Sequence, residues 1–441
     1  MGDTLFVNAR LVDPEQQTER QGALLVRDGV IAEISNNPMP PNGPDTEIID
    51  CAGHVLAPGL VDLGAKVCEP GERHKESFRS AGAAAAAGGV TTMITRPDTL
   101  PAIDSPEQLE FVSRRAAEAA PVRIFPMASL TKGRDGREMV EIGFLQDAGA
   151  VAFTDCDRVV TDTKVLTRCL SYAAGLGALV VAHPQEPGLS RGAAMTSGAA
   201  ASIKGVSSVS PMAERLGLER DLALVEMTGA RYHADNLSAR AALPALARAR
   251  EAGLDVTAGV NIHHLTLNTE AVGDYRTFFK FKPPLRHEED RLAMIDAVGS
   301  GAIDIISSMH TPQDEESKRL PFEEAASGAV ALETLLPASL RLYHDNALSL
   351  PQLFRALALN PARRLGLPSG RLAAGAPADL IVIDPDEPLL LDRFTLRSKS
   401  KNTPFDGAQL KGRVLQTWVG GTRVFAAPDL IQAPSPAAAT G

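Results

Sequence analysis

The feature that most constrains the fold of this chain is a series of short apolar runs between residues 57 and 364, each followed by a stretch with a helical pattern. Eight runs occur, in the order GLVDLGA, VTTMITRP, VRIFPMASL, AVAFTD, ALVVAHP, ARYHADN, LDVTAGVN and IDIISSMH. The helical stretches often open on serine or aspartate and close on glycine, as helix capping favours. Eight strand–helix units in succession are typical of a parallel barrel. The sequence therefore predicts an α/β chain with a (β/α)8 barrel of TIM type over residues 57–364.

The two ends of the chain have a different pattern, with alternating apolar and polar residues and glycine turns. Residues 1–56 contain TLFVNARLV and ALLVRDGVIAEI, and Asp28-Gly29 is a hairpin signal. Residues 365–430 contain ADLIVID and LKGRVLQTWVGGTRVF. Because both ends have the same character, we expect residues 1–56 and 365–430 to form one small β-sandwich domain. The last residues, 431–441, have a composition that predicts disorder.

Composition excludes several classes of partner. The chain has 441 residues and a net charge of −10, whereas nucleic acids and anionic membranes select a basic face. No run of 18 apolar residues and no signal peptide is visible. The four scattered cysteines are typical of reduced thiols in a cytoplasmic protein; they are Cys51, Cys68, Cys156 and Cys169. We therefore expect a cytoplasmic protein without a nucleic-acid or membrane partner.

A barrel enzyme places its chemistry at the carboxyl ends of its strands. Residues 186–211 are small, polar and glycine-rich, which predicts a mobile loop over the barrel mouth. Family-specific motifs lie around these strand ends. They are APGLVD (57–62), EPGERHKES (69–77), GAVAFTD (149–155), PPLR (283–286), NPAR (360–363), GAPADL (375–380) and KNTPF (401–405).

With these motifs the chain resembles dihydroorotases, which are metal-dependent hydrolases of the amidohydrolase superfamily. The resemblance extends from the first strands to about Phe425. It implies a zinc enzyme that forms dihydroorotate by the reversible ring closure of carbamoyl aspartate. Such a site needs imidazole or carboxylate ligands, an open position for water and a carboxylate that moves the proton.

This chain departs from that family pattern at the metal positions. After the first strand, Gly64 and Lys66 replace the His-x-His pair. The strand-four aspartate and the strand-five histidine are retained as Asp155 and His183. The remaining vestigial metal positions are a replaced histidine and the replaced catalytic aspartate, at Asn236 and Met309.

The positions that contact substrate in the family have changed as well. The arginine that holds the substrate carboxylate is replaced by Cys68, and the asparagine of the second strand is replaced by Asp98, just after Arg96. The further vestigial substrate positions are Asn261, Lys282 and His310. For His233 and His310 we expect ordinary core hydrogen bonds.

Asp155 and His183 alone are too few for a catalytic zinc site, which usually has three protein ligands. A cationic lysine cannot donate a lone pair to a metal. We therefore expect no catalytic residue and no cofactor; zinc is implied only if the metal site has been rebuilt. A buried carboxylate needs a counter-charge, so we expect Asp155 to pair with Lys66 or Arg96.

Two replacement sites remain open. Cys68, Cys156 and His183 could form a new zinc site, or one of the cysteines could act as a nucleophile with His183. The adjacent histidines His263 and His264 would point to opposite faces of an extended segment, which argues against a shared metal.

Two functions follow from the resemblance. The first is a non-catalytic dihydroorotase-like protein of pyrimidine biosynthesis, acting as a structural or regulatory partner of aspartate carbamoyltransferase in a homo-oligomer or mixed assembly. The alternative is an active dihydroorotase, or another cyclic amidohydrolase, with a rebuilt metal site. A variant of the first is a sensor of an anionic small molecule, which Lys66, Arg96 and Lys282 would favour.

Overall fold

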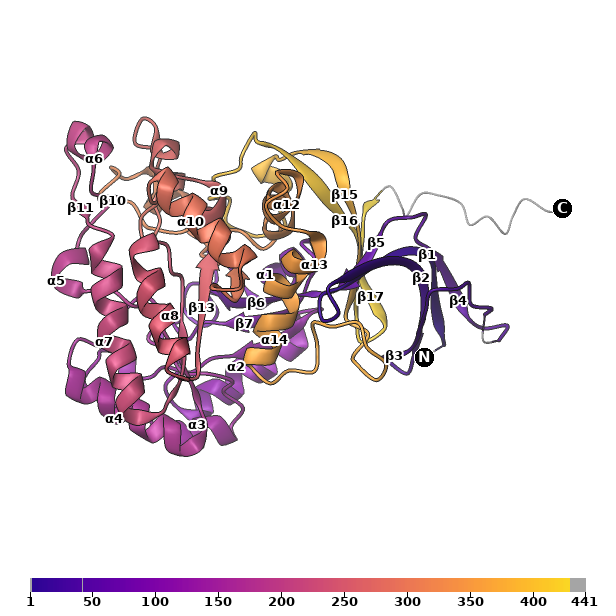
Figure 1. The fold of residues 1–441 in the computed structure, drawn as a ribbon, viewed down its shortest axis with the longest axis horizontal. Helices are drawn as coiled ribbons and strands as arrows, with labels where there is room; N and C mark the ends of the chain where they lie inside the picture. Colours follow the sequence, from indigo (N-terminus) through magenta and orange to yellow (C-terminus); the bar gives the residue numbers. More distant parts are fainter. Residues whose placement is uncertain (1, 42, 429–441) are drawn as a thin grey trace.

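Strands from both ends of the chain form one eight-stranded sheet (Figure 1). The computed structural model describes residues 2–41 and 43–428, so the predicted disorder at 431–441 lies outside the described residues. The sheet has the order β17-β16-β15-β5-β1-β2-β3, and β4 pairs with β1. Its strands are β1 (Thr4–Asp13), β2 (Thr18–Arg27), β3 (Val30–Ser35), β4 (Glu47–Asp50), β5 (Val55–Pro58), β15 (Leu380–Leu390), β16 (Gln409–Val419) and β17 (Thr422–Ala426).

This sheet curls over a core of its own. The rings of Phe6 on β1 and Trp418 on β16 lie 5.2 Å apart, edge to face, although β15 and β5 separate the two strands in the sheet. β5 pairs antiparallel with β15, with Pro58 opposite Leu380, and this ladder joins the two ends of the chain. The prediction that both ends of the chain join in one small β domain is therefore confirmed. The predicted hairpin turn at Asp28-Gly29 connects β2 and β3.

The eight predicted apolar runs line up as a barrel, but one of them is not a regular strand. Two parallel sheets, β6-β7-β8 and β9-β12-β13-β14, are joined through Phe153, which bridges Ala128 on one side and Val180 on the other. At the closing edge, Lys66 N donates to His310 O at 2.8 Å. The strands are β6 (Leu60–Ala65), β7 (Val90–Thr95), β8 (Arg123–Pro126), β9 (Leu179–Ala182), β12 (Arg231–Ala234), β13 (Val256–Asn261) and β14 (Ile305–Ser307).

Helices cover the outside of the barrel, and their caps follow the sequence. Ser77 and Ser80 form a reciprocal capping box at the start of α1. Asp162 caps α4, which ends at Gly177 in the left-handed region. These helices include α1 (Phe78–Ala87), α2 (Pro106–Ala119), α3 (Ile142–Asp147), α4 (Thr163–Leu176), α7 (Met212–Thr228), α8 (Leu243–Glu251), α10 (Glu288–Gly299), α12 (Leu335–His344), α13 (Leu350–Phe354) and α14 (Asn360–Arg364).

The segment predicted as a loop over the mouth, 186–211, contains regular structure. It forms α5 (Pro187–Ser190), β10 (Met195–Thr196), α6 (Ala199–Lys204) and β11 (Ser208–Val209), and β10 pairs in parallel with β11. Thr196 Oγ1 donates to Leu285 O at 2.9 Å and receives a hydrogen bond from buried Arg286 at 3.3 Å. The segment 186–211 is thus held to the barrel by hydrogen bonds to the PPLR motif.

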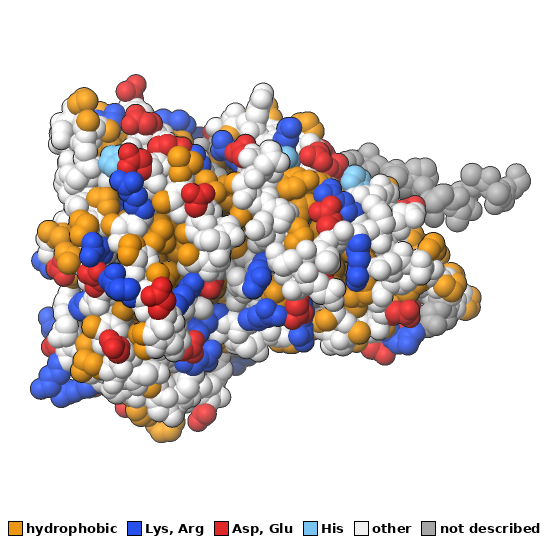
Figure 2. All heavy atoms as spheres, viewed as in Figure 1, with side chains coloured by type: hydrophobic (Ala, Val, Ile, Leu, Met, Phe, Trp, Pro, Cys, Tyr) orange, Lys and Arg blue, Asp and Glu red, His pale blue; other side chains and the backbone are white. Residues whose placement is uncertain are grey.

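The face drawn in Figure 2 carries charged side chains of both signs. Figure 2 shows acidic and basic side chains interspersed over that face, without a single-sign stretch. Among the described residues, none of the helices combines the length and apolarity needed to cross a bilayer. All four cysteines are buried and unpaired, as expected.

Candidate functional site

At the end of β6, the side chain of Met309 packs closely against Gly64. Gly64 has φ of +97°, a conformation that side chains rarely adopt, and a Cβ atom there would lie 3.0 Å from Met309 Sδ. Met309 itself follows β14 with φ of +45°. An imidazole at position 64 would therefore require a strained or altered backbone and a shift of the Met309 side chain. The replacements at two family positions are therefore coupled sterically.

Lys66, at the second of the two metal positions after the first strand, contributes a positive charge instead of a metal ligand. Lys66 Nζ lies 3.2 Å from Asp98 Oδ2, and Arg96 Nη2 lies 3.0 Å from the same oxygen. Arg96 and Asp98 are buried, at 8% and 7% exposure. Burial alone would lower the pKa of Arg96, but the neighbouring Asp98 carboxylate raises it above its ordinary value. One carboxylate thus lies between two cations at the barrel mouth.

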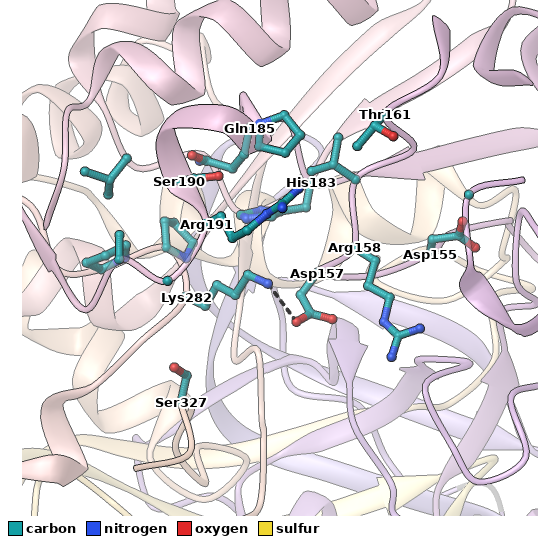
Figure 3. A pocket seen from close by; sticks show the side chains of 18 of the residues that line it. Asp155, Asp157, Arg158, Thr161, His183, Gln185, Ser190, Arg191, Lys282 and Ser327 are labelled. Atoms are coloured by element: carbon teal, nitrogen blue, oxygen red, sulfur yellow. Dashed lines mark hydrogen bonds and ion pairs between the residues drawn. The ribbon is translucent and has the colours of Figure 1, made fainter. Parts of the chain in front are cut away.

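A second carboxylate, Asp157, extends this ionic network. Its oxygens lie 2.9 Å from Arg134, 3.1 Å from Lys282 and 3.9 Å from Arg96. Figure 3 shows Lys282 and Asp157 facing each other across the pocket. Burial opposes ionisation of Asp157, but the three cations, with Lys282 foremost, hold its pKa well below the usual range. Sequence reasoning missed Asp157; its only signal was an acidic residue two positions after the fourth run.

Asp155 does not pair with Lys66 or Arg96, so that expectation is wrong. Its carboxylate accepts hydrogen bonds from Leu130 N at 3.0 Å and from Thr131 N and Oγ1 at 3.0 and 2.5 Å. In the described residues, no lysine or arginine nitrogen lies within 4 Å of it. The N–H donors of the turn replace the expected counter-charge. In Figure 3 Asp155 lies to the right, away from Lys282.

The residue that faces the strand ends after the fourth run is Cys156. It has φ of +56° and, with Arg96, His183, Asn236 and Met309, lines a space of about 20 Å³, the size of one water molecule. Burial raises the pKa of the Cys156 thiol to about 12. Burial, together with Lys282, lowers the pKa of His183 to about 3, so its imidazole is neutral at pH 7.

Four polar atoms at this small space have no hydrogen-bond partner among the described residues: Arg96 Nε, His183 Nε2, Asp235 Oδ1 and Asn236 Oδ1. His183 is 6% exposed and its Nε2 is unpartnered. Asp235, which sequence reasoning did not single out, is 9% exposed with an unpartnered Oδ1. Burial, reinforced by Asp62, raises the pKa of Asp235 to about 6. The floor of the barrel mouth is therefore lined by four polar atoms that do not hydrogen-bond to one another.

The histidines of the sixth and eighth runs have internal partners. His233 Nδ1 lies 2.9 Å from Thr257 Oγ1. His310 Nδ1 accepts from Ala331 N at 3.0 Å, and its Nε2 lies 3.5 Å from Glu76 Oε2. Both imidazoles are fully buried. Each histidine thus makes a hydrogen bond in the core through Nδ1, while neither Nε2 has a hydrogen-bond partner in the described residues.

A predicted metal position, Asn236, and a predicted substrate position, Asn261, also have structural roles. Asn236 Nδ2 donates to Lys282 O at 3.1 Å, and Asn261 Oδ1 caps the short helix α9 (Ile262–Thr266) at His263 N. The expectation of an extended segment at His263 and His264 is therefore wrong, because this Asn cap starts a helical turn there. Both histidines are buried, and His263 lies 4.6 Å from the ring of Phe281.

The residues present do not fit a catalytic metal. In the described part of the chain, no group of three or more His, Cys, Asp or Glu side chains is placed to hold an ion. That finding includes the proposed set of Cys68, Cys156 and His183. Cys68 is 1% exposed, and burial raises the pKa of its thiol to about 12, which argues against a nucleophilic cysteine.

Two of the family motifs supply hydrogen bonds that hold the mouth together. Glu76 of the EPGERHKES loop accepts from Ser398 Oγ and from Lys399 N. Asn402 of KNTPF donates to Thr311 O at 3.1 Å and Gly328 O at 3.0 Å. These hydrogen bonds join the loop after β6 and the KNTPF segment to the rest of the barrel mouth.

Above the strand ends lies a cavity of about 830 Å³ (Figure 3). It is lined by the segments 134–137, 155–161, 183–193, 280–284 and 323–327, with Val209. Its size is that of a site for a small organic molecule. The same cavity reaches His183, so it continues to the floor described above.

Comparisons with known proteins agree with the fold. The family model described as Dihydro-orotase-like matches residues 53–242, and one described as Amidohydrolase family matches residues 327–425. A protein named Dihydroorotase from Anaplasma phagocytophilum (strain HZ) is 39% identical over 96% of this chain and 95% of its own. Another, from Wolbachia sp. subsp. Drosophila simulans (strain wRi), is 38% identical over 95% of each chain.

Among solved structures, L-hydantoinase (dihydropyrimidinase) from Arthrobacter aurescens superimposes with a TM-score of 0.87 at 25% identity. The match covers 97% of this chain and 96% of that chain. D-hydantoinase from Thermus sp., at 23% identity and a TM-score of 0.81, shares the fold. The barrel with its flanking sheet is therefore an architecture common to these proteins.

Proposed function

The chain belongs to the dihydroorotase-like family of amidohydrolases, and from that premise we propose that it is a member without a catalytic metal, which acts in pyrimidine biosynthesis by binding. The observation that carries the proposal is the replacement and crowding of the two metal positions after the first strand. Glycine at position 64 faces the sulfur of Met309, and Lys66 at the neighbouring ligand position is ion-paired to Asp98. A metal would meet a thioether and an ammonium group where the family has ligands.

The resemblance further supports a partner for such a protein. Non-catalytic dihydroorotase-like chains assemble with aspartate carbamoyltransferase, and we include that enzyme in the proposal. Its test is co-purification of the tagged chain with aspartate carbamoyltransferase from the same organism. If the two proteins elute separately at micromolar concentration, the partnership is rejected, while the metal-free proposal is decided independently.

A second candidate is an active cyclic amidohydrolase with a rebuilt metal site. The names of the relatives favour it, since proteins 38 to 39% identical over nearly the whole chain are called dihydroorotase. Amidohydrolases are generally metal-dependent, so this candidate requires ligands beyond the family set. The unpartnered His183 Nε2 and Asp235 Oδ1 are the groups from which such a site would start.

One experiment separates the two candidates. The chain is purified from zinc-supplemented cells, its metal content is measured by mass spectrometry, and the hydrolysis of dihydroorotate is assayed with and without added zinc. Less than about 0.1 zinc per chain and no turnover above a blank are expected. Near-stoichiometric zinc together with turnover would overturn the metal-free proposal in favour of the second candidate.

A further inference from the structure

A second cavity lies at the end of the barrel opposite the mouth, where the barrel meets the eight-stranded sheet. Its volume is about 350 Å³, and we call it the interdomain cavity. One lining residue, Asp304, directly precedes β14, so the cavity is at the amino ends of the strands. Figure 1 shows α13 and α14 between the barrel and the hairpin of β1 and β2. The lining comes from the β1–β2 turn (Gln17), the end of α10 and the residues after it (298–301, 303 and 304), α13 (Gln352), residues 355 and 356, and α14 (Asn360).

The walls of the interdomain cavity are fixed by hydrogen bonds from both parts of the molecule. Gln17 Nε2 donates to Pro351 O at 3.3 Å, which joins the β1–β2 turn to α13. Asn360 Nδ2 donates to Asp304 O at 2.8 Å, which joins α14 to the start of β14. Between α13 and α14, Arg355–Leu359 form a turn of π-helix, a rare structure that is frequent at functional sites. Ligand sites also occur preferentially at domain boundaries.

Arg355 brings a positive charge to this cavity. Its side chain is exposed, and no carboxylate lies within 4 Å of its guanidinium group in the described chain. Asp304, the acidic residue of the described lining, is already engaged by Arg250 and by Ala258 N, the latter at 2.7 Å. A planar guanidinium group matches the two oxygens of a carboxylate. Arg355 is therefore available for the carboxylate of a ligand.

The carboxyl end of α10 brings a negative potential to the same cavity. Such a helix end favours cations, and the last turn of α10 has no basic side chain of its own. Gly299 O accepts a long hydrogen bond from Gln352 Nε2, at 3.4 Å. Gly301 O accepts from Arg250 at 3.0 Å, and no donor in the described part of the chain reaches Ser300 O. An ammonium group fits these carbonyl oxygens.

We propose that the interdomain cavity binds a free amino acid in its zwitterionic form, with the carboxylate on Arg355 and the ammonium group at the carbonyl oxygens that end α10. The described lining has one basic and one acidic residue, Arg355 and Asp304, so a ligand without net charge matches it. The amide groups of Gln17, Gln352 and Asn360 also line the cavity. They favour a side chain that both donates and accepts hydrogen bonds, such as that of glutamine. The cavity is apart from the strand ends at the mouth, so the proposal is independent of the metal-free function.

The two charges of the ligand can be tested one at a time. Isothermal titration calorimetry of the full chain compares L-glutamine with N-acetyl-L-glutamine, which lacks the ammonium group, and with L-glutamine α-amide, which lacks the carboxylate. We expect glutamine to bind with a Kd of about 1 mM or below, and each blocked form to bind about tenfold more weakly or worse. Saturating glutamine should also raise Tm by mass action, because it binds the folded chain. The proposal is overturned if glutamine fails to bind below about 10 mM, or if either blocked form binds as well as glutamine.

L-leucine tests the role given to the amide groups. It keeps both charges but has an apolar side chain, so it should bind about tenfold more weakly than glutamine, because it leaves the amides without partners. Equal binding of leucine and glutamine would overturn the assignment of an amide side chain.

A charge variant locates the binding. Arg355→Gln should weaken glutamine binding about tenfold, whereas Arg114→Gln, which removes the same charge from an exposed position on α2, should leave it unchanged. Thermal melts check that both variants are folded. An unchanged Kd in Arg355→Gln, or an equal loss in the two variants, would overturn the site. The titrations of the unaltered chain decide the requirement for both charges even if a variant does not fold.

Discussion

Met309 Sδ lies 3.0 Å from the point where the Cβ atom of any residue larger than glycine at position 64 would go, which is closer than an ordinary van der Waals contact. The two residues come from opposite ends of the barrel sequence, on β6 and after β14, and meet where the barrel closes. Each therefore restricts what the other can become. A stepwise return to a metal site must pass through a sterically unfavourable intermediate.

This contact gives a double-mutant prediction. Gly64→Ala should cost about 2 to 3 kcal/mol in unfolding free energy, because it combines left-handed backbone strain with overpacking. In a Met309→Ala background the cost of Gly64→Ala should fall by about 0.5 to 1 kcal/mol, since only the backbone strain remains. Urea unfolding of the four proteins measures both values. Equal costs in the two backgrounds would show that the methionine does not restrict position 64.

The ionic network at the mouth predicts a large effect at Asp98. Asp98→Asn should destabilise the chain by about 3 kcal/mol, because it leaves the buried Arg96 and the mostly buried Lys66 without their shared counter-ion. The control is Glu138→Gln, which removes the exposed pair with Lys132 and should change stability by less than about 0.5 kcal/mol. Chemical denaturation measures both. A small effect at Asp98 would mean that the cations rearrange toward solvent.

Metal removal should leave the stability of this chain unchanged. Because the residues at the strand ends do not fit an ion, 5 mM EDTA or equimolar zinc should shift Tm by less than about 1 °C, whereas a specifically bound ion stabilises the folded state by mass action. Differential scanning calorimetry is the measurement. A rise of several degrees with zinc that EDTA reverses would show a specific site.

Acid should destabilise the fold through its neutral histidines. Burial, with the nearby His264, lowers the pKa of His263 to about 3 from 6.5. The unfolded chain therefore binds a proton between pH 6.5 and about 3 that the folded chain does not, so stability falls as pH falls through this window. His263→Gln should reduce the slope by up to about 1.4 kcal/mol per pH unit. Urea unfolding at pH 7.5, 6.0 and 5.0 tests this, and an unchanged slope would contradict it.

The ion pair between Arg286 and Glu214 should control how often the segment 186–211 opens away from the barrel. Both side chains are almost fully buried and lie 3.3 Å apart. Glu214→Gln should cost about 3 kcal/mol and speed tryptic cleavage after Arg191, because Arg286 also holds Thr196. The rate of cleavage relative to that after exposed Arg114 is the readout. A uniform increase at both arginines would indicate global destabilisation instead.

The barrel and the shared sheet are predictable because they rest on local patterns. The alternation of apolar and polar residues, the turn glycines and caps such as Asp162 can each be recognised from a few adjacent residues. The fourth run is the exception. Within residues 2–41 and 43–428, this run makes bridges to its neighbours through Phe153 alone, a detail that depends on how β8 and β9 approach each other.

The site was less predictable, since it depends on which of two adjacent residues turns inward. Sequence comparison selects Asp155, but the turn at 130–131 captures its carboxylate, and Cys156 with its positive φ faces the strand ends. Asp157 and Asp235 have no counterpart in the family pattern quoted for the chain. Their importance comes from cations and burial contributed by distant segments, which no local signal contains.

The ladder between β5 and β15 has a consequence for how the protein is made. β5 is complete by residue 58, but its partner is not synthesised until residue 390, so one edge of the first sheet stays open while the whole barrel is translated. An exposed strand edge invites pairing with other chains. Premature termination within the barrel should therefore give aggregating products rather than shortened soluble ones, and the last strands act as the closing step of biosynthesis.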